Sequence, residues 1–222
     1  YNYHKGMKGI IQELKVLLKT KSIGTNSDRA LLLDFQAALE TKPEKAIKLE
    51  KDALAQIENI TADNARLVSN LHANLGGLYR MNGHPDLARE HMEKSISLLD
   101  QFNLLHINDS IPQIANYAMF LTEQQEPERG ISELQKLSGI IKEYHSDDCL
   151  DYAKVQETLG TIYLMTANLP QAKTHFKRAF KIYEKIWADE PEMIEAKYQE
   201  IQELYPQIGF CIGKNLSGLL TK

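Results

Sequence analysis

Apolar residues recur every three or four positions along most of the chain, which is the spacing of one face of an α-helix. The stretches with this pattern come in pairs, and a turn signal such as Asn82-Gly83 separates the two members of a pair. Proline begins several of the second stretches, where its fixed φ suits the first helical turn. The pattern therefore predicts four helical hairpins, which lie within residues 27–60, 63–99, 110–141 and 147–187.

Short polar residues stand before several of these stretches, where a side-chain oxygen can cap the first turn of a helix. We expect the caps to be Ser27 or Asp28, Asp63 or Asn64, and a residue within 146–148. These caps would fix the residue at which the first helix of each hairpin begins.

The two ends of the chain carry incomplete versions of the same unit. A helical pattern within residues 3–18 predicts the second helix of a truncated repeat, and residues 191–204 predict one further helix. Glycines after Pro206 interrupt the last apolar residues, so we expect a short irregular cap there. The expected organisation is a truncated repeat with its linker at 1–26, four 42-residue repeats at 27–190, and a partial fifth repeat or cap at 191–222.

Small residues recur at a fixed interval, as close crossing of two antiparallel helices requires. Three sets of positions follow a period of 42 residues and differ only in their offset within the repeat. The first set is Asp34, Gly76, Ala118 and Gly160, the second is Ala46, Ala88, Gly130 and Ala172, and the third is Glu50, Met92, Leu134 and Phe176. The acidic residues at 34 and 50 depart from this pattern, as expected of a degenerate repeat near one end of an array.

The residues at these positions resemble the signature of the tetratricopeptide repeat (TPR) family. The resemblance is carried by Leu75-Gly76, Tyr79 and Ala88, and again by Leu159-Gly160, Tyr163, Ala172, Phe176 and Ala179. Because the usual tetratricopeptide period is about 34 residues, the longer period here is similar to the kinesin-light-chain type. The resemblance implies an all-α, right-handed α-solenoid of antiparallel helix pairs. HEAT-type arrays overlap in period but do not predict the Gly, Tyr and Ala spacing, so they rank second.

Composition narrows the possible partners. A formal net charge of −4 leaves no basic surplus for nucleic acid or an anionic membrane. No apolar run approaches the roughly 20 residues of a membrane span, and Cys149 and Cys211 are too few and too far apart for a disulfide framework. These features favour a cytoplasmic chain with reduced thiols.

Motifs of known enzymes are absent from the sequence. It has no H-E-x-x-H, G-x-S-x-G, C-x-x-C or glycine-rich phosphate loop, so we expect no enzymatic activity and no cofactor. The densest group of potential metal ligands, His145-Ser-Asp-Asp-Cys149, lies in a linker and has no second ligand pair nearby, so we expect no metal site. His91 and His175 occupy the same place in their repeats, where packing or solvent accounts for both.

The remaining candidate function is binding on the first helices of the repeats. The resemblance implies that these helices expose one side on a concave groove and that an asparagine two residues before the glycine holds a peptide backbone; Asn74 and Asn116 match this position. We expect a protein or peptide segment to bind there. The predicted partner-binding residues are Asn70, Asn74, Arg80, Asn116, Met119, Glu123, Lys154 and Thr158.

An alternative assigns the chain a different role with the same fold. The sequence begins at Tyr1 inside a helical pattern, as a segment of a longer protein would. The chain would then be the regulatory or sensor arm of a multidomain signalling protein, with a nucleotide-hydrolysing or DNA-binding effector outside the segment.

Overall fold

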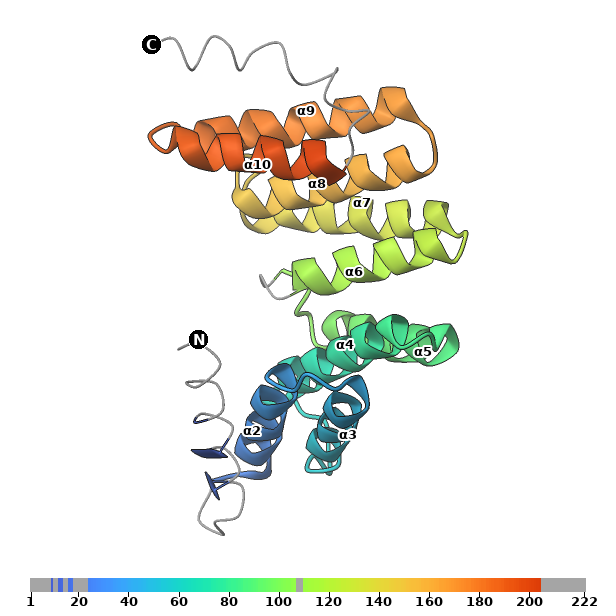
Figure 1. Ribbon diagram of the computed structural model, residues 1–222, viewed down its shortest axis with the longest axis vertical. Helices are drawn as coiled ribbons and strands as arrows, with labels where there is room; N and C mark the ends of the chain where they lie inside the picture. The colour runs from blue at the N-terminus through green and yellow to red at the C-terminus, as the bar shows by residue number, and fades with distance from the viewer. Residues whose placement is uncertain (1–8, 10–11, 14–15, 18–23, 107–109, 205–222) are drawn as a thin grey trace. The chain divides into compact units, whose positions relative to one another are not determined.

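The computed structural model describes residues 9, 12–13, 16–17, 24–106 and 110–204, and within these ranges it contains helices and no strand. The helix predicted within 3–18 and the cap predicted after Pro206 therefore lie largely or wholly outside the described residues. The helices are shown in Figure 1. They are α2 (Asn26–Ala38), α3 (Pro43–Leu54), α4 (Ala65–Met81), α5 (Pro85–Gln101), α6 (Ser110–Glu123), α7 (Pro127–Tyr144), α8 (Leu150–Met165), α9 (Leu169–Ile186) and α10 (Pro191–Leu204).

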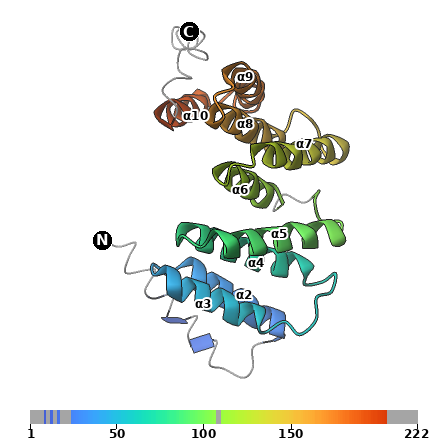
Figure 2. The same cartoon turned by 90° about the vertical axis from the view of Figure 1, so that its right-hand side faces the viewer.

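Consecutive helices pack as antiparallel pairs, as the hydrophobic pattern predicts. The pairs α2–α3, α4–α5 and α8–α9 are packed against each other, α3 also contacts α4, and α7 contacts α8. Figure 2 shows α4 beside α5, and α8 beside α9. The chain divides into two compact units, residues 1–117 and 118–222, and each unit is described by itself.

The small residues lie where two helices cross, which confirms the predicted register. A Cβ atom added to Gly76 of α4 would lie 2.6 Å from Cγ of Met92 on α5. A Cβ atom on Gly160 of α8 would lie 2.8 Å from the ring of Phe176, which is fully buried. Only glycine fits such crossings without displacing the facing helix.

The turn inside each hairpin also repeats with the 42-residue period. Gly83, Gln125 and Ala167 all have positive φ, at 76°, 64° and 59°. After Gly83, the backbone N–H of His84 donates to the carbonyl of Tyr79 at 2.9 Å. Bonds of the same kind follow Gln125 and Ala167, so a left-handed residue closes each of these helices.

Two of the predicted helix caps are wrong. Thr25, rather than Ser27 or Asp28, caps α2, because its hydroxyl accepts from the N–H of Asp28 while the Asp28 carboxylate accepts from the Thr25 N–H. Cys149 caps α8 in place of a residue within 146–148, with its sulfur accepting from the N–H of Tyr152 at 3.4 Å.

The cap predicted for α4 is partly right. Asn64 directly precedes this helix, as expected. Its side-chain oxygen instead accepts from the backbone N–H of Thr61 at 2.8 Å and so stabilises the linker before the helix.

Candidate functional site

A groove lies in the first unit, where side chains from α2, α4, α5 and α6 surround a volume of about 560 Å³. Both polar and apolar side chains face it. The lining residues are Asp34, Asn70, Ala73, Asn74, Gly77, Arg80, Met81, Met92, Ser95, Pro112, Gln113 and Asn116.

The groove brings together four of the eight predicted partner-binding residues. Asn70, Asn74 and Arg80 reach the groove from α4, and Asn116 reaches it from α6. Asn70 and Asn74 lie on successive turns of one face, because residues four apart share a helix face, whereas Arg80 lies six residues after Asn74. Met81, which is 81% exposed, stands at the same surface.

Asn74 is already held by two acidic side chains. Its amide nitrogen donates to Oδ1 of Asp34 at 2.9 Å and to Oε1 of Glu50 at 3.3 Å. The sequence predicted an amide group open to a peptide backbone. A partner must therefore compete for the amide hydrogens or bind the amide oxygen of this residue.

A hydrogen-bond network around Gln113 forms the floor of the groove, and the sequence analysis did not include it. Oε1 of Gln113 accepts from the hydroxyls of Ser69 and Ser95, at 2.8 and 2.5 Å. Nε2 of Gln113 donates to Oδ1 of Asn70. Both serines are buried, so the network fixes the start of α6 against α4 and α5. The signal in the sequence was two serines on otherwise apolar helix faces.

The electrostatics of the groove are dominated by the carboxyl groups of Asp34 and Glu50. Glu50 is only 2% exposed. Its burial, together with the charge of Asp34 and a hydrogen bond with it, raises the pKa of Glu50 to about 9. Burial also raises the pKa of Asp34, against the lowering effect of its hydrogen bonds. Glu50 therefore keeps its proton at neutral pH, beside the carboxyl group of Asp34.

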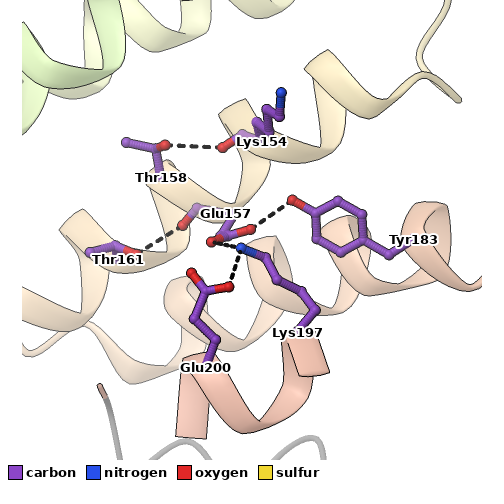
Figure 3. Close-up of polar contacts among 7 residues, drawn as sticks. All are labelled: Lys154, Glu157, Thr158, Thr161, Tyr183, Lys197 and Glu200. Carbon is purple, nitrogen blue, oxygen red and sulfur yellow. Dashed lines mark hydrogen bonds and ion pairs between the residues drawn. The ribbon is translucent and has the colours of Figure 1, made fainter. Parts of the chain in front are cut away.

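The other four predicted residues lie in the second unit. Met119 and Glu123 belong to the second half of α6, where Met119 is half-buried and Glu123 is exposed. Lys154 and Thr158 are neighbours on α8, since the Thr158 hydroxyl donates to the Lys154 carbonyl at 3.0 Å (Figure 3). Lys154 also forms an ion pair with Asp151 at 3.8 Å.

Beside these residues, Glu157 joins α8 to α9 and α10. The hydroxyl of Tyr183 on α9 donates to Glu157 Oε2 at 2.6 Å, and Nζ of Lys197 on α10 lies 2.9 Å from Oε1 (Figure 3). Burial would lower the pKa of Lys197, but its bonds with Glu157 and Glu200 outweigh burial and raise it. The helix predicted at 191–204 is thus tied to the fourth repeat by an ion pair that is mostly shielded from solvent.

The repeated histidines pack on tyrosines, which is one of the two explanations that the sequence left open for their shared position. His91 stacks on Tyr79 with ring centres 5.4 Å apart, and His175 stacks on Tyr163 at 5.2 Å. Nδ1 of His91 also lies 2.9 Å from Nδ1 of His72. Burial, followed by the charge of His91, lowers the pKa of His72 to about 4.

Neither a metal cluster nor a membrane span occurs in the part of the chain that the structure describes. No three His, Cys, Asp or Glu side chains gather there in a way that could hold a metal ion. No helix of the described ranges is long and apolar enough to cross a bilayer.

Comparison with known proteins agrees with this architecture. Residues 110–185 match the tetratricopeptide repeat family. The crystal structure of BtubC (BKLC) from P. vanneervenii is similar, with a TM-score of 0.67, 19% identity, and coverage of 82% of this chain and 72% of that chain. The comparison with curated proteins gave no match.

Two further solved structures are similar. A putative kinesin light chain of Podosopora anserina, with nearly identical TPR-like repeats, has a TM-score of 0.70, 13% identity, and coverage of 85% and 92% of the two chains. MamA has a TM-score of 0.57, 16% identity, and coverage of 82% and 92%.

The helix pairs and these likenesses define the class as an all-α repeat solenoid. Within that class, residues 110–185 match the tetratricopeptide repeat family, and the described chain has the fold of kinesin-light-chain-like tetratricopeptide repeats. The tetratricopeptide repeat fold is in general that of a protein-interaction scaffold, and this chain has that fold.

Proposed function

We propose that the chain is a protein-interaction scaffold and that the groove in residues 24–117 binds an extended or helical segment of another protein. The observation that carries this proposal is the groove itself. It gathers Asn70, Asn74, Arg80 and Asn116 from two first helices around one open volume.

The chemistry of the lining suits a polypeptide. Asparagine side chains can donate and accept hydrogen bonds at once, which matches the paired N–H and C=O groups of a peptide backbone. Met81 and Met92 offer flexible apolar surface that can adapt to different side chains. A volume of about 560 Å³ is within the range of protein binding sites and has room for several side chains.

The proposed site also includes residues of the second unit. Met119, Glu123, Lys154 and Thr158 belong to the first helices of the third and fourth repeats, at positions related by the 42-residue period to the groove residues of α4. We propose that these side chains of the second unit also contact a protein partner. These four side chains combine polar groups with a methionine, as the lining of the groove also does.

A purification of partners from cells of the source organism tests this function. The wild-type chain, the Asn74→Ala/Asn116→Ala variant, and a control with Lys94→Ala on the exposed side of α5 would be compared by quantitative mass spectrometry. We expect partners of the wild type to be lost from the asparagine variant, with affinity reduced by roughly 1–3 kcal/mol per asparagine, and retained by the control. Equal recovery by the asparagine variant, with loss in the Lys94 control, would place binding on the other side of the helices.

A further inference from the structure

Two acidic residues of the first repeat occupy positions that the other repeats fill with small or apolar side chains. Asp34 stands where the others have Gly or Ala, and Glu50 stands where they have Met, Leu or Phe. Replacing a buried apolar side chain by a carboxyl group removes packing and adds a desolvation cost. The first repeat therefore carries these acids at a cost to its own stability, and a gain elsewhere is needed to account for them.

The acids lie together at the wall of the groove. Asp34 lines the groove directly, and the amide of Asn74 bridges Asp34 to Glu50. Oε2 of Glu50 is buried and receives no hydrogen bond from the described residues. Because two carboxylates cannot bond to each other without a proton, a cation bound here can take the place of the proton that Glu50 holds in the free chain.

We propose that the groove selects partner segments with a basic side chain, whose ammonium or guanidinium group binds Asp34 with Glu50 behind it. This inference rests on the proposed function of the groove and specifies the chemistry of its partner. A cation at this point supplies positive charge in place of the proton that Glu50 holds in the free chain. Glu50 reinforces the site through Asp34 and Asn74, since its own side chain is nearly inaccessible to a ligand.

Arg80 is the basic residue among the side chains that line the groove, and it takes part in an interaction of its own. Arg80 lies six residues after Asn74 on α4, which corresponds to about 9 Å along the helix axis. Lys51 follows Glu50 on α3, and its ammonium group lies over the ring of Tyr79, with Nζ 5.6 Å from the ring centre.

The test uses blocked peptide sublibraries in which one position is fixed and the others are randomised. The fixed residue is Arg, Lys, citrulline, Leu or Glu, and retention on the immobilised wild-type chain is measured for each. We expect Arg and Lys sublibraries to be retained about fivefold more than the citrulline sublibrary, which has the shape of Arg without its charge. Equal retention of Arg and citrulline sublibraries would overturn the inference.

Two variants assign the preference to the acidic pair. Asp34→Ala with Glu50→Leu restores the residue types of the other repeats and should fold while losing the preference for basic peptides. Glu44→Gln removes one exposed charge from α3 outside the groove and should keep the preference. A preference that persists in the double variant, or disappears in the control, would also overturn the inference.

The pH dependence gives a second readout. A bound cation favours ionisation of Glu50, so affinity for the Arg sublibrary should rise between pH 7 and 9, by at most about tenfold per pH unit for one proton. Glu50→Gln should remove this rise, and a rise that survives in Glu50→Gln would contradict the role of Glu50. The outcomes separate the two proposals: Asn74-dependent retention without charge preference refutes only the basic partner, whereas no retention of any sublibrary refutes the peptide groove as well.

Discussion

Gly76 and Gly77 are adjacent in α4 but have different surroundings. A Cβ atom at Gly76 would meet both the side chain and the backbone of Met92, whereas a Cβ atom at Gly77 would meet nothing within 4 Å. We expect Gly76→Ala to destabilise the chain by about 1–3 kcal/mol through overpacking. Gly77→Ala should stabilise it by about 0.5–1 kcal/mol, because alanine restricts the unfolded chain more than glycine. Urea unfolding measures both, and equal effects would contradict the helix crossing.

Glu50 makes folding stability depend on pH. Its pKa in the folded chain is about 9, above the value of about 4.3 expected when unfolded. The folded state therefore binds the proton more tightly, and stability falls as pH rises from 5 to 9, by at most about 1.4 kcal/mol per pH unit.

The Glu50→Gln variant isolates this effect. Glutamine cannot ionise, so stability in urea should decline less between pH 5 and 9 than in the wild type. Glu44→Gln, at an exposed position of the same helix, should keep the wild-type slope. Parallel declines in wild type and Glu50→Gln would show that Glu50 ionises normally in the folded chain.

The hairpin turns give a prediction at the scale of the helical elements. Ala167 adopts a φ of 59° at the position where an earlier repeat has Gly83. A left-handed conformation costs an L-residue roughly 1–2 kcal/mol, which glycine avoids. Ala167→Gly should therefore raise the free energy of unfolding by up to about 1 kcal/mol, and Gly83→Ala should lower it by about 1 kcal/mol. Thermal unfolding that shows no loss for Gly83→Ala would argue against this turn.

The crossing of α8 and α9 depends on Phe176. Its ring is fully buried against Gly160, so truncation leaves a cavity between the two helices. We expect Phe176→Ala to cost about 3–5 kcal/mol, while Lys177→Ala at the exposed neighbouring position should change stability by less than about 0.5 kcal/mol. Denaturant unfolding distinguishes the two, and an unchanged midpoint for Phe176→Ala would refute the register.

The sequence predicts the elements better than their ends. Proline at the first helical position and the glycines at the crossings act locally, so their spacing alone locates α3, α5 and α7. Thr25 caps α2 through a reciprocal pair of hydrogen bonds with Asp28. Other short polar residues stand nearby in the sequence, and the sequence does not show which of them forms such a pair. Cys149 was missed because a thiol is a weak acceptor and not a usual cap.

The candidate site was predicted only in part for a related reason. Asn70 and Asn74 are four residues apart and share a face of one helix, and helical periodicity reveals such a pair. Asp34 and Gln113 come from α2 and α6, and their bonds to the asparagines of α4 arise only when the helices pack. Periodicity indicates which face of a helix is polar, but it does not show which polar groups of different helices meet.

At the scale of the whole molecule, the repeats supply a framework and each unit presents its own polar surface. The groove in residues 24–117 is built by one complete hairpin together with its neighbours on either side. In residues 118–204, the Glu157 network ties α10 to the fourth repeat. The proposed function therefore depends on the side chains that line the groove, and the fold alone does not determine it.

Site-specific photocrosslinking tests the groove most directly. A photoreactive p-benzoylphenylalanine would replace either Met81, exposed in the groove, or Leu87, 40% exposed on α5 and outside it. In cells of the source organism, the account predicts a crosslinked protein partner from position 81 that is lost when Asn74→Ala and Asn116→Ala are added, and little from position 87. A partner captured from position 87 and not from position 81 would contradict the account.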